Sequence, residues 1–253
     1  MTMPTACAPR AAPSSRLDAL FLRARGLMRR FDVEGYAGAA ARYREILTLE
    51  PASARALAGL AETYAFWGFR LEISGLECRS YHALARASAA AALRAEPGRA
   101  EGHRAMSLAI GRGSERDRER ARREALVALA LDPNDAEGWH QAWRAGGYDL
   151  DDPSLRRALE LGRTFALEND LGAALCRAGR PDEAVARFMA ALRLNPRNAL
   201  AHYNLAMTLD LMGMRRTAAE VVRKARAVQP DDELLLRGGE LLAGGASAFL
   251  EGA

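Results

Sequence analysis

The residues of this chain that could bind a metal or act as a nucleophile are few and scattered. Cys78 and His82 lie four residues apart, so on a helix they would share one face and could supply two metal ligands. A structural metal site needs about four ligands, and His103, His140 and His202 are far apart along the chain. No phosphate-binding glycine loop, nucleophile motif or pair of catalytic carboxylates is present. We therefore expect no catalytic residue, metal or cofactor, and a protein that is not an enzyme.

The densest cluster of charge is the run from Arg112 to Glu124, which could be taken for a nucleic-acid-binding stripe. Its arginines alternate with acids at helical spacing, a pattern that favours ion pairs on a solvated helix face. A nucleic-acid surface would need charge of one sign and aromatic side chains for stacking. The net charge is +4, but all of the basic residues except Lys224 are arginine. A GC-rich genome produces this bias whatever the function, so the sequence argues against a nucleic-acid partner.

The spacing of five prolines indicates which structural elements would position any functional side chain. Pro51, Pro97, Pro133, Pro196 and Pro230 each follow an apolar run. Pro196 and Pro230 are 34 residues apart, and the other gaps are that period with insertions or deletions. A fixed period of this size indicates one small helical unit stacked several times. Such arrays act by binding other molecules.

The last two units show what each repeated position does. Leu171 and Leu175 share one helix face, and Gly179 is expected to end that helix in a left-handed conformation. Ala184 and Ala191 line a second helix, where small side chains allow a close crossing. Adding 34 to each number finds the corresponding residues of the next unit, namely Leu205, Leu209, Gly213, Ala218 and Ala225.

This pattern resembles the tetratricopeptide repeat of bacterial proteins, and the resemblance covers nearly the whole chain. Trp139 occupies the first-helix slot where the family favours tryptophan, and His103 and His202 fill the same slot as half-buried packing residues. The first two units are also similar to the repeat modules beside adenylate cyclase or winged-helix domains of bacterial regulators, but neither domain is present in this sequence. The resemblance implies an all-α, elongated superhelix of about six helix pairs, without β-sheet, that binds another protein.

The pattern divides the chain into three segments. We expect a disordered tail over residues 1–16, the repeat array over 17–230, and a capping helix with its tail over 231–253, with Asp231 or Asp232 as N-cap. The capping segment is rich in leucine and glycine, so we expect it to leave apolar surface for a partner or a second copy.

Residues 69–80 exceed the repeat length and are too apolar for a solvated loop. They either extend the flanking helices, which we favour, or form a contact surface.

The sequence predicts a cytoplasmic protein. It contains neither an 18-residue apolar stretch nor the hydrophobic segment of a secretory signal. An organellar transit peptide over residues 1–15 is the alternative. Cys7, Cys78 and Cys176 show no pairing pattern, which is typical of a reducing compartment.

Equivalent positions on the first helices should form columns along the concave face of the array. Buried polar groups without partners cost roughly 1–3 kcal/mol, so the polar members of these columns are expected to face water or a ligand. Their arginines predict a groove for a segment bearing carboxylates, and changing Arg144 and Arg177 to Glu should abolish capture of the partner. The predicted groove residues are Arg104, Arg112, His140, Arg144, Tyr148, Asn169, Arg177, Tyr203 and Met207.

Three functions follow as hypotheses. The leading one is a non-enzymatic adaptor or scaffold that binds a partner peptide or domain, especially an acidic segment, in the concave groove. The second is an obligate subunit or assembly factor, with a permanent contact at the convex face or a homo-oligomer formed through the C-terminal helix. A nucleic-acid-binding solenoid is the least favoured. No membrane partner is expected.

Overall fold

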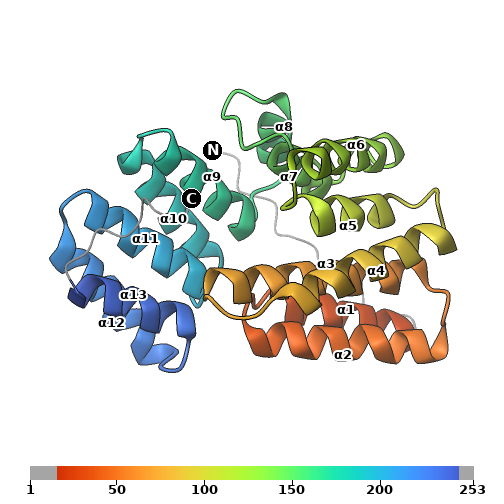
Figure 1. Cartoon of the computed structure of the whole chain (residues 1–253), viewed down its shortest axis with the longest axis horizontal. Coiled ribbons are helices and arrows are strands. Elements are labelled where there is room, and N and C mark those ends of the chain that lie inside the picture. Colours follow the sequence, from red (N-terminus) through yellow and green to blue (C-terminus); the bar gives the residue numbers. More distant parts are fainter. Residues whose placement is uncertain (1–15, 245–253) are drawn as a thin grey trace, which may run out of the picture.

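The computed structural model describes residues 16–244, which fold into thirteen α-helices with no strand among them (Figure 1). The N-terminal tail predicted over residues 1–16 lies almost wholly outside this range, and so does the end of the C-terminal tail, residues 245–253. The helices are α1 (Arg16–Met28), α2 (Val33–Leu49), α3 (Ala54–Ile73), α4 (Arg79–Ala95), α5 (Ala100–Ile110), α6 (Glu115–Leu131), α7 (Ala136–Ala145), α8 (Pro153–Leu161), α9 (Phe165–Arg177), α10 (Pro181–Leu194), α11 (Ala199–Leu211), α12 (Arg215–Val228) and α13 (Glu233–Gly244).

Consecutive helices pack as six pairs, from α1/α2 to α11/α12, and α13 covers the last pair by packing on both α11 and α12. This confirms the predicted all-α array of about six helix pairs. Small residues allow the close crossings. A Cβ atom added to Gly172 of α9 would lie 2.6 Å from the ring of Phe188 on α10, and Ala184 and Ala191 of α10 are fully buried.

The turns of the repeat follow the sequence signals. Gly179 and Gly213 have φ values of +72° and +78°, which confirms the expected left-handed helix ends. The residues at the repeat position of Trp139 also share one hydrogen bond, to the carbonyl oxygen of a preceding proline. The indole nitrogen of Trp139 donates to the carbonyl oxygen of Pro133 at 2.9 Å. The ring nitrogens of His103 and His202 make the same contact with the carbonyl oxygens of Pro97 and Pro196, which can only accept.

Residues 69–80, which exceed the repeat length, mostly extend the flanking helices. Helix α3 has 20 residues and runs to Ile73, which confirms helix extension over residues 69–73, and residues 74–78 form the loop to α4. At the other end of the array, Asp232 caps α13 by accepting from the main-chain nitrogens of Leu234 and Leu235 at 3.1 and 3.2 Å. This confirms one of the two predicted N-caps.

Helix α13 exposes less apolar surface than the sequence suggested. Leu234, Leu235 and Leu242 are buried, and Leu236 and Leu241 are half-buried. The apolar surface predicted for this helix is therefore largely covered within the described residues, because α13 packs across two helices at once. Phe249, a further apolar residue of the predicted capping segment, lies outside them.

The two ends of the array meet. Figure 1 shows the C-terminal end of α3 beside the α12–α13 end of the chain, and Arg237 donates to the carbonyl oxygen of Ile73 at 2.7 Å. The turn between α1 and α2 also contacts the loop after α10, where the amide nitrogen of Asn195 donates to the carbonyl oxygen of Arg29 at 3.3 Å. The structure thus differs from the elongated array that the repeats led us to expect, because contacts between its two ends close it into a ring.

Candidate functional site

The ring encloses a central cavity of about 630 Å³. First helices of the early and middle repeats form much of its wall, and the α1–α2 turn and the start of α9 complete it. Six arginines but only two glutamates line it. The charged residues of the wall are Arg25, Arg29, Arg30, Arg104, Arg144, Arg163, Glu62 and Glu137, and the apolar ones include Met28, Phe31, Phe66, Leu108, Phe165 and Leu194.

Arg104 is one of three predicted groove residues that line this cavity, and its charge is already neutralised within the protein. The guanidinium lies 2.8 Å from Glu62 of α3 and also pairs with Asp135, the N-cap of α7, and with Glu137 at 3.6 Å. The side chain is only 12% exposed. Arg104 therefore links three successive repeats.

His140 and Arg144, the other two, share one carboxylate of the next repeat. The Nε2 atom of His140 lies 3.0 Å and the Nε atom of Arg144 lies 3.4 Å from Asp170 of α9. Burial opposes ionisation of Asp170, but the neighbouring Arg144 and His140 outweigh it and lower the pKa of this carboxyl. These polar groups thus satisfy one another across the α7–α9 step, which explains why polar residues recur on this face.

Arg112, Tyr148 and Arg177 lie outside the wall of the central cavity. The guanidinium of Arg177 lies 4.9 Å from the ring centre of Tyr148, whose hydroxyl accepts from Arg144 at 3.2 Å. Arg112 pairs with Glu72 at 3.0 Å and is 40% exposed. These side chains join neighbouring repeats, so the structure does not bring them together with Arg104.

The remaining predicted residues also lie apart from the central cavity. Asn169 is buried and accepts from the side-chain nitrogen of Asn204 at 3.0 Å. Met207 is buried in the apolar core, and Tyr203 is half-buried and packs against that core. Whether any of the nine predicted residues contacts a partner stays a prediction.

Two cavity arginines that the sequence did not single out have guanidinium groups without an acidic partner among residues 16–244. Arg25 and Arg29 are exposed, and neither side chain forms an ion pair with a described residue, whereas Arg30 and Arg163 pair with nearby acids. Arg25 and Arg29 are one helical turn apart, a spacing that the sequence does show. The first unit departs from the repeat pattern, however, so aligned columns did not include them.

The contact that closes the ring surrounds Phe31, in the α1–α2 turn. Its ring centre lies 5.4 Å from that of Phe66 on α3 and 4.1 Å from that of Phe165 on α9. Phe31 has a φ of +55°, which is rare for a bulky side chain. We call this contact the ring junction; it comprises Phe31, Phe66, Phe165, Arg70, Asp232 and the Arg29–Asn195 and Ile73–Arg237 bonds.

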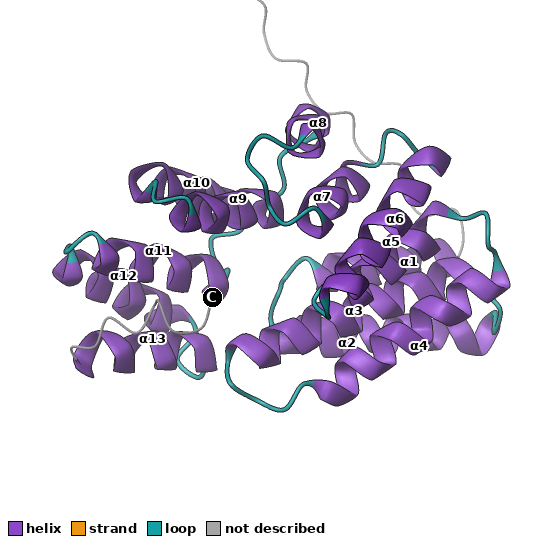
Figure 2. Ribbon diagram, turned by 45° about the horizontal axis from the view of Figure 1, so that its top comes forward, coloured by secondary structure: helices purple, strands orange, loops and turns teal. Residues whose placement is uncertain are grey.

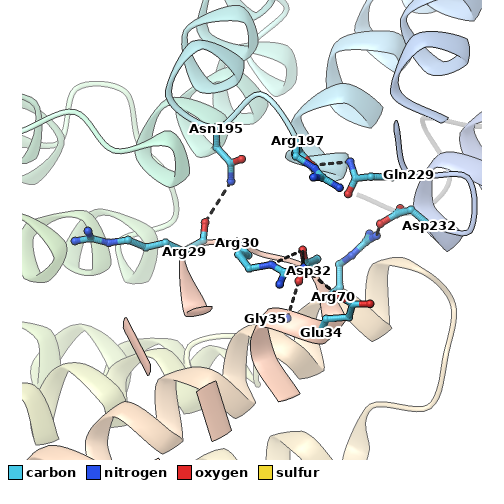
Figure 3. Close-up of polar contacts among 10 residues, drawn as sticks. All are labelled: Arg29, Arg30, Asp32, Glu34, Gly35, Arg70, Asn195, Arg197, Gln229 and Asp232. Atoms are coloured by element: carbon cyan, nitrogen blue, oxygen red, sulfur yellow. Dashed lines mark hydrogen bonds and ion pairs between the residues drawn. The ribbon is translucent and has the colours of Figure 1, made fainter. Parts of the chain in front are cut away.

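An ion pair at the ring junction joins Arg70 of α3 to Asp232 at the start of α13 (Figure 3). The two side chains are 5% and 10% exposed. The Nη1 atom of Arg70 is buried without a hydrogen-bond partner among the described residues. Beside it lies a smaller cavity of about 40 Å³, and Phe31, Phe66 and Phe165 line both this cavity and the central one.

The metal and membrane expectations can be compared with the described residues only. His82 lies 3.8 Å from Glu72 rather than beside a set of ligands, and no group of three or more His, Cys, Asp or Glu side chains within residues 16–244 could hold a metal ion. None of the described helices is both long and apolar enough to span a bilayer.

Comparisons with known proteins agree with the fold. Residues 175–237 match the family model described as tetratricopeptide repeat. No curated protein matches the chain. Among solved structures, TTC0263, a thermophilic TPR protein of Thermus thermophilus, is 22% identical, with 75% of this chain and 98% of that chain covered and a TM-score of 0.57.

Two further solved structures are larger than this chain. The human IFIT1 dimer with PPP-AAAA is 17% identical over 88% of this chain and 51% of that one, with a TM-score of 0.64. The APC/C hetero-tetramer Cut9–Hcn1 is 15% identical over 91% of this chain and 46% of that one, with a TM-score of 0.58. At these identities the likeness concerns the fold alone. Residues 175–237 thus match the tetratricopeptide repeat model, and the six stacked helix pairs have the fold of solved tetratricopeptide repeat structures.

Proposed function

We propose that this protein is a non-enzymatic adaptor that binds a short acidic segment of a partner protein in the central cavity. The tetratricopeptide repeat fold supports a role in protein–protein interaction in general. The observation that carries the finer proposal is the cavity wall, with its excess of arginines and with the exposed Arg25 and Arg29, which form no ion pair with a described residue.

The charged and apolar side chains of the central cavity wall indicate which kind of ligand it would bind. Arg104 and Arg144 are held by internal carboxylates, so they shape the wall rather than offer free charge. Arg25 and Arg29 can donate charge-assisted hydrogen bonds to the carboxylates of a ligand. Aromatic and aliphatic side chains of the wall would contact apolar residues between those carboxylates. A cavity of about 630 Å³ is in the range of sites for small ligands, so it suits a few residues of chain rather than a folded domain.

The structure also decides which variants test the proposal. Arg144→Glu, alone or with Arg177→Glu, would place a second carboxylate beside Asp170 and is expected to destabilise the fold. Arg25→Glu with Arg29→Glu reverses charge at exposed positions instead. Arg23→Glu with Arg94→Glu is the matched control, because both arginines are exposed, lie outside the cavity wall and form no ion pair with a described residue.

The experiment uses an array of immobilised peptides of three matched compositions: acidic–apolar, neutral–apolar and basic–apolar. The wild-type protein and the control should bind the acidic–apolar set, and Arg25→Glu with Arg29→Glu should lose that binding. Equal binding to all three sets, or acidic binding that survives in the Arg25/Arg29 variant, would reject this site.

The alternative of an obligate subunit has its own supporting observation. A groove of about 440 Å³ lies between α12 and α13, with Val222, Pro230 and Leu242 in its wall. A permanent partner or a second copy could cover it. Light scattering of the purified protein separates the two functions, because an adaptor should be a stable monomer whereas an unpartnered subunit should self-associate.

A further inference from the structure

We propose that the ring junction is a clasp, that the step between α8 and α9 is the hinge opposite to it, and that a partner segment enters the central cavity when the clasp opens. The inference rests on the proposed function for the identity of the ligand. The clasp and hinge themselves rest on three features of the structure that do not depend on that function.

The first feature is that the ring junction lies outside the apolar cores. One buried cluster contains side chains from α1 to α7, and another contains side chains from α7 to α13. Within the described residues, neither cluster includes both sides of the junction, and no helix of α1–α3 packs closely along a helix of α9–α13. Small contacts between parts of one chain, outside a shared apolar core, permit relative motion by default.

The second feature is the chemistry of the junction contacts. Arg70 and Asp232 leave water to form their ion pair, and the desolvation of two charges offsets much of the attraction between them. One nitrogen of Arg70 stays without a partner among the described residues, and Phe31 keeps a left-handed φ, both of which are unfavourable. These costs offset part of the stabilisation that the aromatic cluster and the hydrogen bonds of the junction supply.

The third feature is the sparse backbone packing between α8 and α9, on the side of the ring opposite the junction. Helix α8 has only nine residues, and residues 162–164 connect it to α9. The backbones of α8 and α9 do not approach closely, unlike those of α2 and α3, α4 and α5, α6 and α7, or α10 and α11. Figure 2 shows α9–α13 as one stack and α1–α6 as another, with α7 and α8 between them. Buried side chains of α7, α8 and α9 belong to one apolar cluster, so rotation at this step would pivot about that cluster and move one stack relative to the other.

Phe31 couples the clasp to the binding site. It lines the central cavity and also the smaller cavity next to Arg70. Arg29, which carries one of the guanidinium groups without an acidic partner among residues 16–244, makes the main-chain bond to Asn195 at the same junction (Figure 3). A ligand that contacts Arg29 and Phe31 would therefore favour the closed ring, and closure would in turn favour the bound ligand, because such coupling is reciprocal.

The first test measures the shape of the full chain by small-angle X-ray scattering. Arg70→Met and Asp232→Asn each remove the junction ion pair, and Asn at position 232 keeps the Oδ1 acceptor that caps α13. Both variants should show a larger radius of gyration at unchanged helical content. Arg122→Met is the control, because its ion pair with Asp152 at 3.4 Å joins neighbouring helix pairs away from the junction. Scattering profiles that coincide with the wild type would overturn the clasp.

The second test locks the junction by a disulfide. Ile73→Cys and Arg237→Cys, at the second junction contact and outside the wall of the central cavity, are introduced with Cys7, Cys78 and Cys176 changed to Ala. The oxidised form, in which disulfides link the two cysteines directly or through a short bis-methanethiosulfonate, is compared with the reduced form of this one variant. The probe is the acidic–apolar peptide that binds best in the array, labelled with fluorescein. Its association should be at least about tenfold slower in the oxidised form, since entry then lacks the opening step.

The outcomes separate the two proposals. Equal association rates in the oxidised and reduced forms would overturn the clasp while leaving the adaptor function intact. Absence of peptide binding to the wild type and to both forms would reject the acidic-segment function instead, and the scattering comparison would still decide whether the junction opens. Slower association of the oxidised form, together with larger dimensions of Arg70→Met, would support both.

Discussion

Neighbouring repeats and the two ends of the array are held together in different ways. Between and within neighbouring helix pairs, side chains such as Phe188 and Trp143 are fully buried, and glycine or alanine allows helices to cross closely. At the ring junction an ion pair, two hydrogen bonds to main-chain carbonyls and one aromatic cluster make the contact. The stack is thus stabilised by apolar burial, whereas the junction is stabilised by a few directional contacts.

This difference predicts which substitutions should destabilise the fold and which should mainly change the overall shape of the protein. In repeat arrays the stability is close to a sum over units and their nearest-neighbour interfaces. The contact between the first and last units adds a long-range link to that sum. Damage to the stack should therefore lower stability strongly, and damage to the junction should change the shape more than the stability.

The largest loss of stability is expected from Phe188→Ala. The ring is 1% exposed and packs against Gly172, so its removal leaves a cavity and should lower the free energy of unfolding by about 3–5 kcal/mol. Urea denaturation followed by circular dichroism measures this loss. Met189→Ala on the same helix is the control, since Met189 is 49% exposed. Equal losses for the two variants would contradict the view that apolar burial dominates the stack.

Asp170→Asn tests the polar contacts of the α7–α9 step. Removing the carboxylate leaves Arg144 buried without its partner and should cost about 3 kcal/mol. Because the folded state lowers the pKa of Asp170, this stabilisation is present above the unfolded value of about 3.9 and is lost as the pH falls through the folded value. Unfolding free energies measured from pH 6 downward should fall less steeply for Asp170→Asn than for the wild type. Parallel profiles would show that Asp170 has no such role.

Gly213→Ala probes the local signal that ends the first helix of a repeat. Gly213 has a φ of +78°, and an L-residue there should cost about 1–2 kcal/mol. Gly98→Ala is the matched control, because its added Cβ would meet open space and the change should be neutral or slightly stabilising. Thermal unfolding of both variants makes the comparison, and a loss at Gly98 equal to that at Gly213 would remove the conformational explanation.

The smallest loss of stability, but a clear change of shape, is expected from Phe31→Ala. The lost aromatic contacts with Phe66 and Phe165 should cost about 1 kcal/mol, while the radius of gyration rises. Trp67→Ala removes a comparable contact with Tyr81, 4.5 Å between ring centres, between α3 and α4. That variant should keep the wild-type dimensions. A similar expansion of both variants would mean that the junction is not special.

Much of the fold could be predicted because its signals are local and repeated. The prolines and the glycines at positions 179 and 213 mark helix ends through backbone sterics, and alanines spaced along one helix face mark close crossings. The shared slot of His103, Trp139 and His202 could be aligned, and its common hydrogen bond to a preceding proline carbonyl follows from the same local turn. Helix α1 was the least predictable, because its sequence departs from the pattern.

The candidate site was predictable only in part. Alignment placed Arg104, His140 and Arg144 on one face, and all three do line the central cavity. Their acidic partners Glu62 and Asp170 belong to adjacent repeats, so the neutralisation of their charge depends on how far each repeat is rotated against the next. Column alignment does not determine that rotation.

The sequence by itself determined the repeat, the number of helix pairs and the caps, because each depends on contacts within one unit or between neighbouring units. The tertiary structure alone decided that the array closes into a ring. Arg70 and Asp232 are separated by 162 positions, and their meeting depends on small rotations summed over all the intervening repeats. The same rotations bring Arg25, in the first helix, and Arg29, just after it, into the wall of the central cavity, which is why the cavity and its closure are visible only in the folded chain.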